Sequence, residues 1–166
     1  FIYTGRLSPG PDIVMEVYAA AKLLLMDALD EILHSRVLLH ISPTSVFDIG
    51  TQAYMFDDKD VQEACENFIC EHFGAVSRTE SFLQQHLECI MHFIASDRLF
   101  LPEGEVQLAA AVLRWLQYRP SERIESLPTL LKHIRFSELP ESELQGIKNS
   151  VLPESPIFEQ LCLFLE

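Results

Sequence analysis

The chain has 166 residues and a formal net charge of −13 at pH 7, because 25 acidic residues outnumber 12 basic ones. Binding to nucleic acid or to an anionic membrane requires clustered Lys and Arg, so this charge argues against both kinds of partner and leaves a soluble protein or a basic protein partner. Since 48% of the residues are hydrophobic, a chain of this length can build a substantial core and corresponds to one domain or one and a half.

The first element expected along the chain is a strand at Phe1–Thr4, where β-branched and aromatic residues are concentrated. A strand is not stable alone, so its sheet partners are expected upstream of this sequence. The chain also lacks an initiator Met, and we therefore expect an internal fragment of a longer protein. The Gly- and Pro-rich residues 5–12 predict a turn.

Two helices are expected between Asp12 and about Leu39. Apolar residues at helical spacing are expected to form the inward stripe of the first helix: Ile13, Val17, Ala20 and Leu24. The segment "LLLMDALDEIL" begins the second helix. A domain boundary is expected near His40–Ser42, where this helical layer ends and a capped hairpin begins.

A helical hairpin is expected from Ser42 to Ala75. Ser42 is a favourable N-cap residue and Pro43 a favourable first helical residue, and the acidic run Asp57–Asp60 marks the turn between the two helices. The apolar residues of the first helix share one stripe: Val46, Ile49, Ala53 and Phe56. Those of the second helix do the same: Val61, Cys65, Phe68, Ile69 and Phe73.

The remainder of the chain predicts further short helices. Two are expected over residues 77–97, with their apolar residues inward: Phe82, Leu83, Leu87, Ile90, Met91 and Ile94. The next helix, which Pro120 ends, holds the single Trp of the chain, Trp115. Its apolar residues form two adjacent stripes, Val106, Ala109, Ala110, Leu113 and Leu116 beside Leu108, Ala111, Val112 and Trp115. An apolar arc of this width predicts a helix packed on two sides, with Trp115 as a core anchor.

No pattern of catalytic or metal-binding residues is found in this sequence. His86, Cys89 and His92 follow one another at three-residue steps, which spreads them over about 120° of a helix instead of directing them to one point. A core thiol between surface histidines explains them better than a metal site. The sequence contains no G-x-S-x-G, H-E-x-x-H or Gly-rich phosphate loop. We therefore expect a non-catalytic binding protein that uses no cofactor.

Four cysteines indicate a reducing compartment. They contain no Cys-x-x-Cys pair and lie among apolar residues, as buried free thiols do: Cys65, Cys70, Cys89 and Cys162. No apolar run approaches the roughly 20 residues of a membrane span, and the first residues do not resemble a signal peptide. A cytoplasmic location is expected, with the nucleus as the alternative reducing compartment.

Several segments, taken in their order, resemble the BTB–BACK architecture of Kelch-like proteins. "FIYTGRL" and "VMEVYAAAKLLLMDALDE" are similar to the last strand and the following two helices of a BTB domain. "ISPTSVFDIGTQAYMFDDKDVQEACENFICEHFGAV" resembles the helix pair that opens the BACK domain. "FLQQHLECIMHFIASDRLFL", "AAAVLRWLQYRPSER" and "LPTLLKHIRFSELPESEL" resemble later BACK motifs. The resemblance spans essentially the whole chain.

This resemblance implies a mainly all-α fold. An antiparallel array of helical hairpins, the BACK domain at residues 42–166, would follow the C-terminal strand and helices of an α/β BTB domain at residues 1–41. Residues 42–75 would form the helix pair called the 3-box. In the family, the Trp-bearing helix lies in the middle of the BACK domain as a scaffold element.

The resemblance also implies a function, that of a substrate-specific adaptor of a cullin-3 RING E3 ubiquitin ligase. In such proteins the BTB domain forms a homodimer and binds the N-terminal region of cullin-3, and the 3-box adds a hydrophobic groove. A C-terminal domain, here outside the chain, binds the protein substrate. The alternative is a BTB–BACK structural or transcriptional scaffold that acts without a cullin.

Residues within the 3-box can be divided into core and interface candidates. The core candidates share the inward stripe: Val46, Ile49 and Ala53. The cullin-binding candidates are Phe47, Tyr54, Ser45 and Gly50. Phe47 and Tyr54 lie off the inward stripe, and exposed aromatic residues on a helix favour an interface. Ordinary partial exposure, or packing against the preceding helices, explains these two aromatic residues equally well.

Overall fold

The computed structural model describes residues 13–151, 153 and 155–164. These residues form helices, turns and loops without a strand, which confirms the predicted mainly α-helical class. The strand expected at Phe1–Thr4 lies outside the described residues. The chain divides into two compact units, an N-terminal unit (Phe1–Ile69) and a C-terminal unit (Cys70–Glu166). The N-terminal unit extends past residue 41 and includes the first hairpin helix and most of the second. The domain boundary expected after residue 41 stays a prediction.

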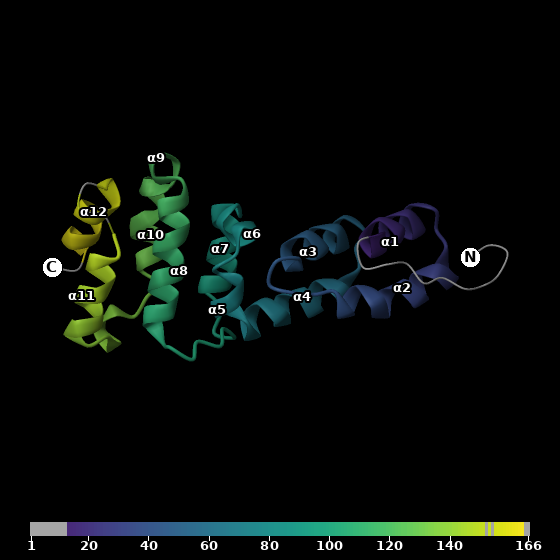
Figure 1. The fold of residues 1–166 in the computed structure, drawn as a ribbon, viewed down its shortest axis with the longest axis horizontal. Coiled ribbons are helices and arrows are strands. Elements are labelled where there is room, and N and C mark those ends of the chain that lie inside the picture. The colour runs from purple at the N-terminus through teal and green to yellow at the C-terminus, as the bar shows by residue number, and fades with distance from the viewer. Residues whose placement is uncertain (1–12, 152, 154, 165–166) are drawn as a thin grey trace. The chain divides into compact units, whose positions relative to one another are not determined.

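The N-terminal unit is built from two helix pairs. Helix α1 (Val14–Leu23) packs along α2 (Asp27–Leu39) (Figure 1). Helix α3 (Val46–Met55) is joined by a short turn to α4 (Lys59–Glu71), whose last two residues belong to the C-terminal unit. The two helices expected for the hairpin are therefore present.

Helix α3 begins at Val46 and not at Pro43 as predicted. The residues before it form a turn in which two serines cap each other. The Ser45 N–H donates to Ser42 Oγ at 3.3 Å, and the Ser42 N–H donates to Ser45 Oγ at 3.1 Å. Because these side chains satisfy the backbone donors locally, the chain turns once before the α-helix begins.

The inward stripe predicted for α1 is wrong by one residue. Ile13 is 46% exposed and Leu24 is 69% exposed, whereas the buried residues of the helix are Val14, Tyr18 and Ala21. Both sets have the same helical spacing, so periodicity does not distinguish them. The second set buries Tyr18, whose hydroxyl donates a hydrogen bond to Asp58 Oδ2 at 2.8 Å.

Helices α1 and α3 end in the same way, with a left-handed residue that is not glycine. Leu25 has φ 53° and Asp57 has φ 52°. After each, the next N–H returns to a carbonyl five residues earlier, Met26 to Ala21 at 3.0 Å and Asp58 to Ala53 at 2.9 Å. This is the Schellman arrangement, in which glycine is the usual residue.

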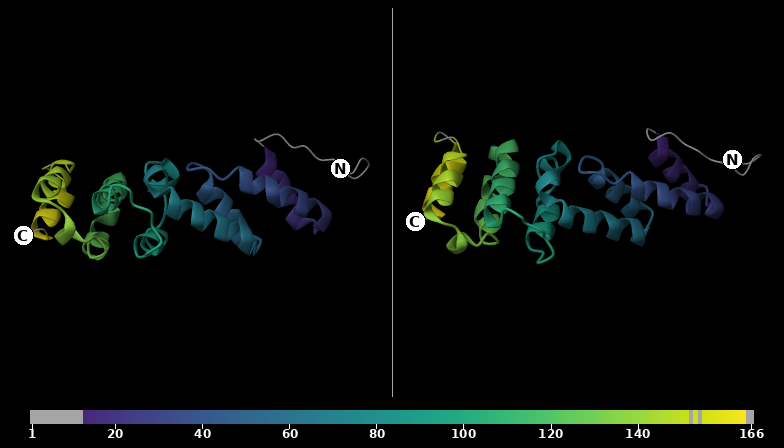
Figure 2. Two further views of the ribbon diagram at one scale, coloured as in Figure 1. Left: turned by 90° about the horizontal axis from the view of Figure 1, so that it is seen from below. Right: turned by 60° about the horizontal axis from the view of Figure 1, so that its bottom comes forward.

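The C-terminal unit is a succession of short helices around one longer helix. Its α-helices are α5 (Phe73–Val76), α6 (Glu80–Leu83), α7 (Leu87–Ile94), α8 (Glu105–Tyr118), α9 (Pro120–Arg123), α10 (Leu127–Leu131), α11 (Glu141–Asn149) and α12 (Pro156–Phe164), with 3-10 turns η2 (Ile124–Ser126) and η3 (Phe136–Glu138). Helix α8 contacts α6, α9, α10 and α11. In Figures 1 and 2, α10 runs beside α8, and α11 and α12 form the next pair.

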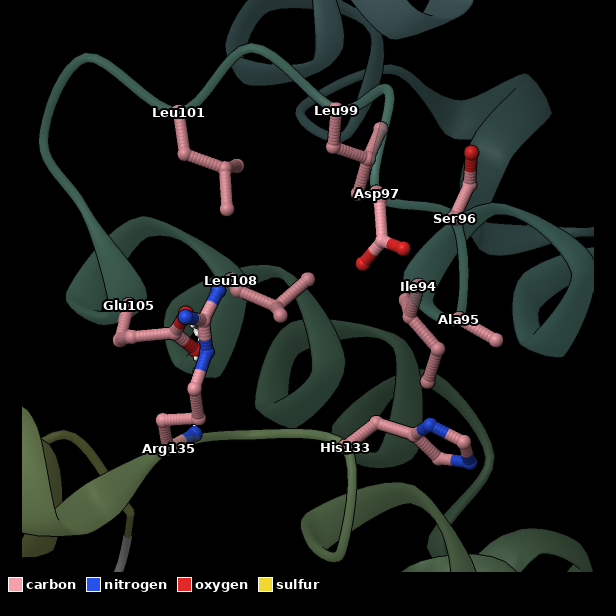
Figure 3. Close-up of a pocket in the computed structure, with 10 residues that line it drawn as sticks. All are labelled: Ile94, Ala95, Ser96, Asp97, Leu99, Leu101, Glu105, Leu108, His133 and Arg135. Carbon is pink, nitrogen blue, oxygen red and sulfur yellow. Dashed lines mark hydrogen bonds and ion pairs between the residues drawn. The ribbon is translucent and has the colours of Figure 1, made fainter.

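Helix α8 is buried on two adjacent faces, which confirms the prediction for this helix. Its buried apolar residues come from both predicted stripes: Leu108, Ala109, Ala111, Val112, Leu113, Trp115 and Leu116. Two charged or polar side chains, Glu105 and Gln107, are buried at its first turn as well. The loop before α8 and the segment after α10 line a pocket of about 410 Å³ at this end of the helix (Figure 3).

Trp115 lies in the core of the C-terminal unit. Polar contacts that the sequence does not reveal hold its side chain there. Its ring nitrogen donates to the Gln85 carbonyl at 3.0 Å. The guanidinium of Arg123 lies 3.9 Å from the centre of the Trp115 ring, and its Nη1 donates to the Trp115 carbonyl at 2.6 Å. Its Nη2 donates to the Leu83 carbonyl at 2.8 Å. One buried arginine thus joins α9 to α8 and to the end of α6.

Candidate interaction surface

The three core candidates of α3 lie in the interior. Val46 and Ala53 have no exposed surface, and Ile49 is 1% exposed. They lie on the face of α3 that is turned toward the rest of the N-terminal unit, and none is available to a partner. Their role here is to hold the helix in place by burying apolar surface.

The expectation that Phe47 is an exposed aromatic is wrong, because its side chain is only 7% exposed. Val46 and Phe47 are adjacent in sequence and both buried, so the buried arc at the start of α3 is wider than one stripe. The alternative considered for Phe47, packing within the chain, agrees with this burial. Phe47 cannot make a broad surface contact without movement of its neighbours.

Tyr54 is exposed, in contrast, and it has an apolar neighbour. Tyr54 is 77% exposed and Met55 is 72% exposed, at the C-terminal end of α3. Asp57, in the turn that follows, and Lys59, the first residue of α4, are also largely exposed, with a weak ion pair of 3.9 Å between them. An aromatic and a flexible thioether side chain next to a charged rim have the composition of a small protein-binding surface. Met55 was not predicted, although its position off the inward stripe could have indicated it.

The other two cullin-binding candidates, Ser45 and Gly50, differ from the aromatic ones and from each other in their surroundings. The Ser45 hydroxyl donates to the His40 carbonyl at 2.7 Å, so it serves the turn before α3. Gly50 is half-buried, and a Cβ atom there would lie 3.7 Å from the Cβ of Cys65, an ordinary van der Waals contact. Packing within the chain therefore does not require glycine at this position.

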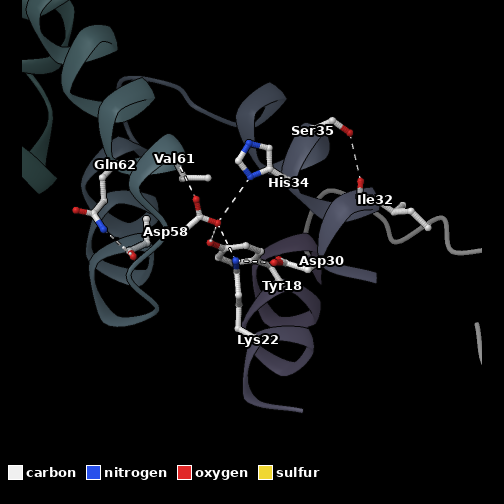
Figure 4. A network of polar contacts seen from close by, with 10 residues as sticks. Tyr18, Lys22, Asp30, Ile32, His34, Ser35, Asp58, Val61 and Gln62 are labelled. Atoms are coloured by element: carbon white, nitrogen blue, oxygen red, sulfur yellow. Dashed lines mark hydrogen bonds and ion pairs between the residues drawn. The ribbon is translucent and has the colours of Figure 1, made fainter. Parts of the chain in front are cut away.

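A buried charge network positions the turn between α3 and α4 (Figure 4). Asp58, which is 9% exposed, accepts hydrogen bonds from the Tyr18 hydroxyl at 2.8 Å and from the Val61 N–H at 3.2 Å. Its Oδ2 also lies 2.9 Å from Lys22 Nζ and 3.7 Å from His34 Nδ1. Asp58 thus caps α4 and binds α1 through the same carboxylate.

Lys22 extends this network to the second helix, because its ammonium also donates to Asp30 Oδ2 at 2.7 Å. Burial alone would raise the pKa of Asp58, but hydrogen bonds from Lys22, Tyr18 and the Val61 N–H outweigh it and hold that pKa below its ordinary value. Burial would lower the pKa of Lys22, yet the two carboxylates raise it above its ordinary value. Burial and the Asp58 carboxylate both raise the pKa of Tyr18.

The described residues contain no group of three or more His, Cys, Asp and Glu side chains that could hold a metal ion. Among the residues of the "HLECIMH" segment, His86 precedes α7, and His92 stacks edge-on against Phe93 at 5.1 Å. Burial raises the pKa of the Cys89 thiol to about 11, so this thiol is protonated at neutral pH. Within the part of the chain that the structure describes, no helix combines the length and the apolar character needed to cross a membrane.

Comparison with known proteins relates this chain to one family. The family model described as "BTB And C-terminal Kelch" (BACK) matches residues 46–149. Kelch-like protein 26 of Homo sapiens is 31% identical over 144 residues, which are 87% of this chain and 23% of that protein. Kelch-like protein 17 of Homo sapiens is 27% identical over 146 residues, or 88% of this chain and 23% of that protein. The chain thus spans about a quarter of the length of these relatives.

Proposed function

Because the chain belongs to the BACK family of Kelch-like proteins, we propose that it is the scaffold of a substrate-specific adaptor for a cullin-3 RING E3 ubiquitin ligase. In this proposal the protein forms a homodimer through its BTB domain and binds the N-terminal region of cullin-3 in the cytoplasm, and also in the nucleus. A domain outside this chain binds the protein substrate. The chain itself catalyses nothing, and it promotes ubiquitin transfer by holding the bound proteins at a fixed distance.

The exposure of Tyr54 is the observation that carries this proposal for the hairpin. Tyr is one of the residue types that most often dominate the binding energy of an interface. Phe47, Gly50 and Tyr54 follow one another at spacings of three and four residues, so they share one stripe of α3. Along this stripe the side chains change from buried to exposed. We propose that the cullin segment contacts Tyr54 and Met55 and passes over Gly50, where the absence of a side chain leaves room.

Phe47 and Ser45 have supporting roles in this arrangement. Phe47 is the buried end of this stripe and packs within the chain, and Ser45 holds the turn before α3 through its hydrogen bond to the His40 carbonyl. The Asp58 network supports the proposal in another way. It anchors the α3–α4 turn to α1 and α2, which by the family resemblance belong to the BTB domain, so a partner could contact both at once.

Calorimetric titration of the cullin-3 N-terminal domain, with its flexible leading segment, into the full-length protein tests this proposal. We expect tight binding that Tyr54→Ala weakens about tenfold, equivalent to about 1.4 kcal/mol. Phe100→Ala is the matched control, because Phe100 is a 62% exposed aromatic in the C-terminal unit. Phe47→Glu is unsuitable, since a charge at a buried position would unfold the helix.

The outcomes separate the parts of the proposal. Tight binding that Tyr54→Ala leaves unchanged would keep the adaptor function and remove this residue from the interface. Equal weakening by Tyr54→Ala and Phe100→Ala would indicate a general loss of structure. No binding of cullin-3 at all would overturn the ligase assignment and favour a scaffold that works without a cullin.

A further inference from the structure

The pocket at the first turn of α8 has properties that the proposed function does not use (Figure 3). Its volume of about 410 Å³ lies within the range of sites that hold small ligands or parts of peptides. It lies wholly within the C-terminal unit. Half of its ten lining residues are apolar and come from α7, the following loop and α8: Ile94, Ala95, Leu99, Leu101 and Leu108. The other half are polar or charged: Ser96, Asp97, Glu105, His133 and Arg135.

Two charged side chains of the pocket, Glu105 and Arg135, neutralise each other. Glu105 is only 7% exposed, and its Oε1 lies 3.1 Å from Arg135 Nε. Its Oε2 accepts the backbone N–H of Arg135 at 3.1 Å. The Arg135 guanidinium also contacts Glu138 Oε1 at 3.4 Å. Arg135 is therefore shared between two carboxylates and is a poor receptor for an anionic ligand.

Asp97 has no such partner. Among the residues that the structure describes, none forms a hydrogen bond or ion pair with its carboxylate. In Figure 3 this carboxylate points into the pocket, between Ile94 and Leu108 and below Leu99 and Leu101. The pocket therefore presents the unpaired, exposed carboxylate of Asp97 next to apolar side chains, and the lining carboxylates outnumber Arg135 by two to one.

We propose that this pocket binds an arginine or lysine side chain from a basic, extended segment of a partner protein. Such side chains combine an aliphatic stem with a terminal charge, so the stem can pack on Leu99 and Leu101 while the head reaches Asp97. Arginine fits better than lysine, because its planar guanidinium pairs with both oxygens of a carboxylate. The net charge of −13 favours the approach of a basic segment. This inference is independent of cullin binding.

Fluorescence anisotropy with the full-length protein and a labelled, N-acetylated peptide Gly-Leu-Arg-Leu-Gly tests this site. Two further peptides replace the Arg with citrulline, which is similar in shape but neutral, or with Glu. We expect the Arg peptide to bind, and Asp97→Asn to weaken it about threefold to fivefold, as for a partly solvated ion pair. Leu101→Ser is expected to weaken the binding of every peptide that binds, because it removes an apolar side chain from the pocket lining.

Matched controls make each outcome decisive. Asp48→Asn changes the net charge equally on an exposed part of α3 and is expected to leave binding unchanged. Asp97→Asn is expected to leave the weaker binding of the citrulline peptide unchanged, and to leave the cullin-3 titration unchanged as well. The proposal is overturned if no peptide binds, if the Glu peptide binds as tightly as the Arg peptide, or if Asp48→Asn and Asp97→Asn have equal effects.

Discussion

Replacement of Asp58 by Asn removes a charge from the centre of the N-terminal unit while it preserves the shape of the side chain. The amide oxygen can still cap α4 by accepting the Val61 N–H, because Asn is as good an N-cap residue as Asp. The amide can no longer accept charge-assisted hydrogen bonds from both Lys22 and Tyr18. Lys22 is left with Asp30 as its only remaining ion-pair partner among the described residues.

The cost of this change follows from the geometry. A hydrogen bond to a charged group contributes about 1.5–3 kcal/mol, and breaking a buried ion pair costs about 3–5 kcal/mol. Because Lys22 keeps its 2.7 Å contact with Asp30, the lower part of these ranges applies. We expect Asp58→Asn to lower the free energy of unfolding of the N-terminal unit by about 2–3 kcal/mol. Urea titration followed by circular dichroism measures this difference, and hydrogen exchange of α1 to α3 assigns it to the unit.

The pH dependence gives a second, independent measure of the same contact. The pKa of Asp58 is lower in the folded chain than its ordinary value of 3.8. Its contribution to stability is therefore complete well above pH 4 and is lost as the pH falls below about 4 toward the folded pKa. Since the Asn variant does not titrate there, the difference in stability between it and the wild type should shrink over this range.

Asp57→Asn is the control, because Asp57 is exposed and Asn also tolerates its positive φ. If both variants cost the same, or if the difference is independent of pH, this account of the network is refuted.

Three further substitutions test local features of the two units. Arg123→Lys should destabilise the C-terminal unit by about 2–3 kcal/mol, because lysine cannot make both carbonyl contacts and stack on the indole, and chemical unfolding followed by Trp fluorescence measures it. Leu25→Gly should stabilise the N-terminal unit by about 0.5–1 kcal/mol, measured by thermal unfolding, because glycine adopts the positive φ without strain. Gly74→Ala should destabilise the C-terminal unit by up to about 1 kcal/mol in urea, because its Cβ would collide with the side-chain amide of Gln107 and displace it from the Glu103 N–H, which that side chain accepts.

Each of these substitutions has a counterpart in the same unit. Arg119→Lys changes an exposed arginine, and an effect as large as that of Arg123→Lys would contradict the role given to the buried guanidinium. Leu24→Gly lacks a positive φ to relieve, so it should not stabilise the unit as Leu25→Gly does. Gly146→Ala places a Cβ in open space within α11 and should be neutral or stabilising. Equal destabilisation by both alanine variants would contradict the predicted collision.

The buried face of a helix could be predicted from the sequence where its apolar residues form only one possible stripe or arc. The wide apolar arc of α8 requires neighbours on two sides, and the structure supplies them. In α1, two stripes of equal spacing compete, and the choice depends on Tyr18 reaching Asp58, which is 40 residues away in sequence. Phe47 was assigned to the surface by its angle on the helix alone. Its burial depends on how wide a face of α3 its neighbours cover, which periodicity does not encode.

The exposed surface at the end of α3 could be predicted from the sequence only in part. Tyr54 and Met55 lie off the inward stripe and are exposed, whereas Phe47, at nearly the same angle on α3 as Tyr54, is buried. The angle on the helix thus proposes candidates for exposure but does not decide among them. Asp58 was expected only as part of an acidic turn, since a sequence does not show which carboxylate will meet a lysine from another helix. The binding roles assigned to α3 stay predictions, because they depend on a partner.

Asp58 and Arg123 make similar kinds of contact in the two units. Each is a buried charge whose partners come from other elements: Tyr18 and Lys22 for Asp58, and the carbonyls of Trp115 and Leu83 for Arg123. Apolar packing gains nearly the same free energy over a range of small helix displacements, whereas a hydrogen bond weakens steeply as its angle changes. A buried charge with several directional partners therefore restricts the angles between helices more than leucine contacts alone. This restriction suits a scaffold, whose proposed contribution to ubiquitin transfer is the fixed geometry of the proteins that it holds.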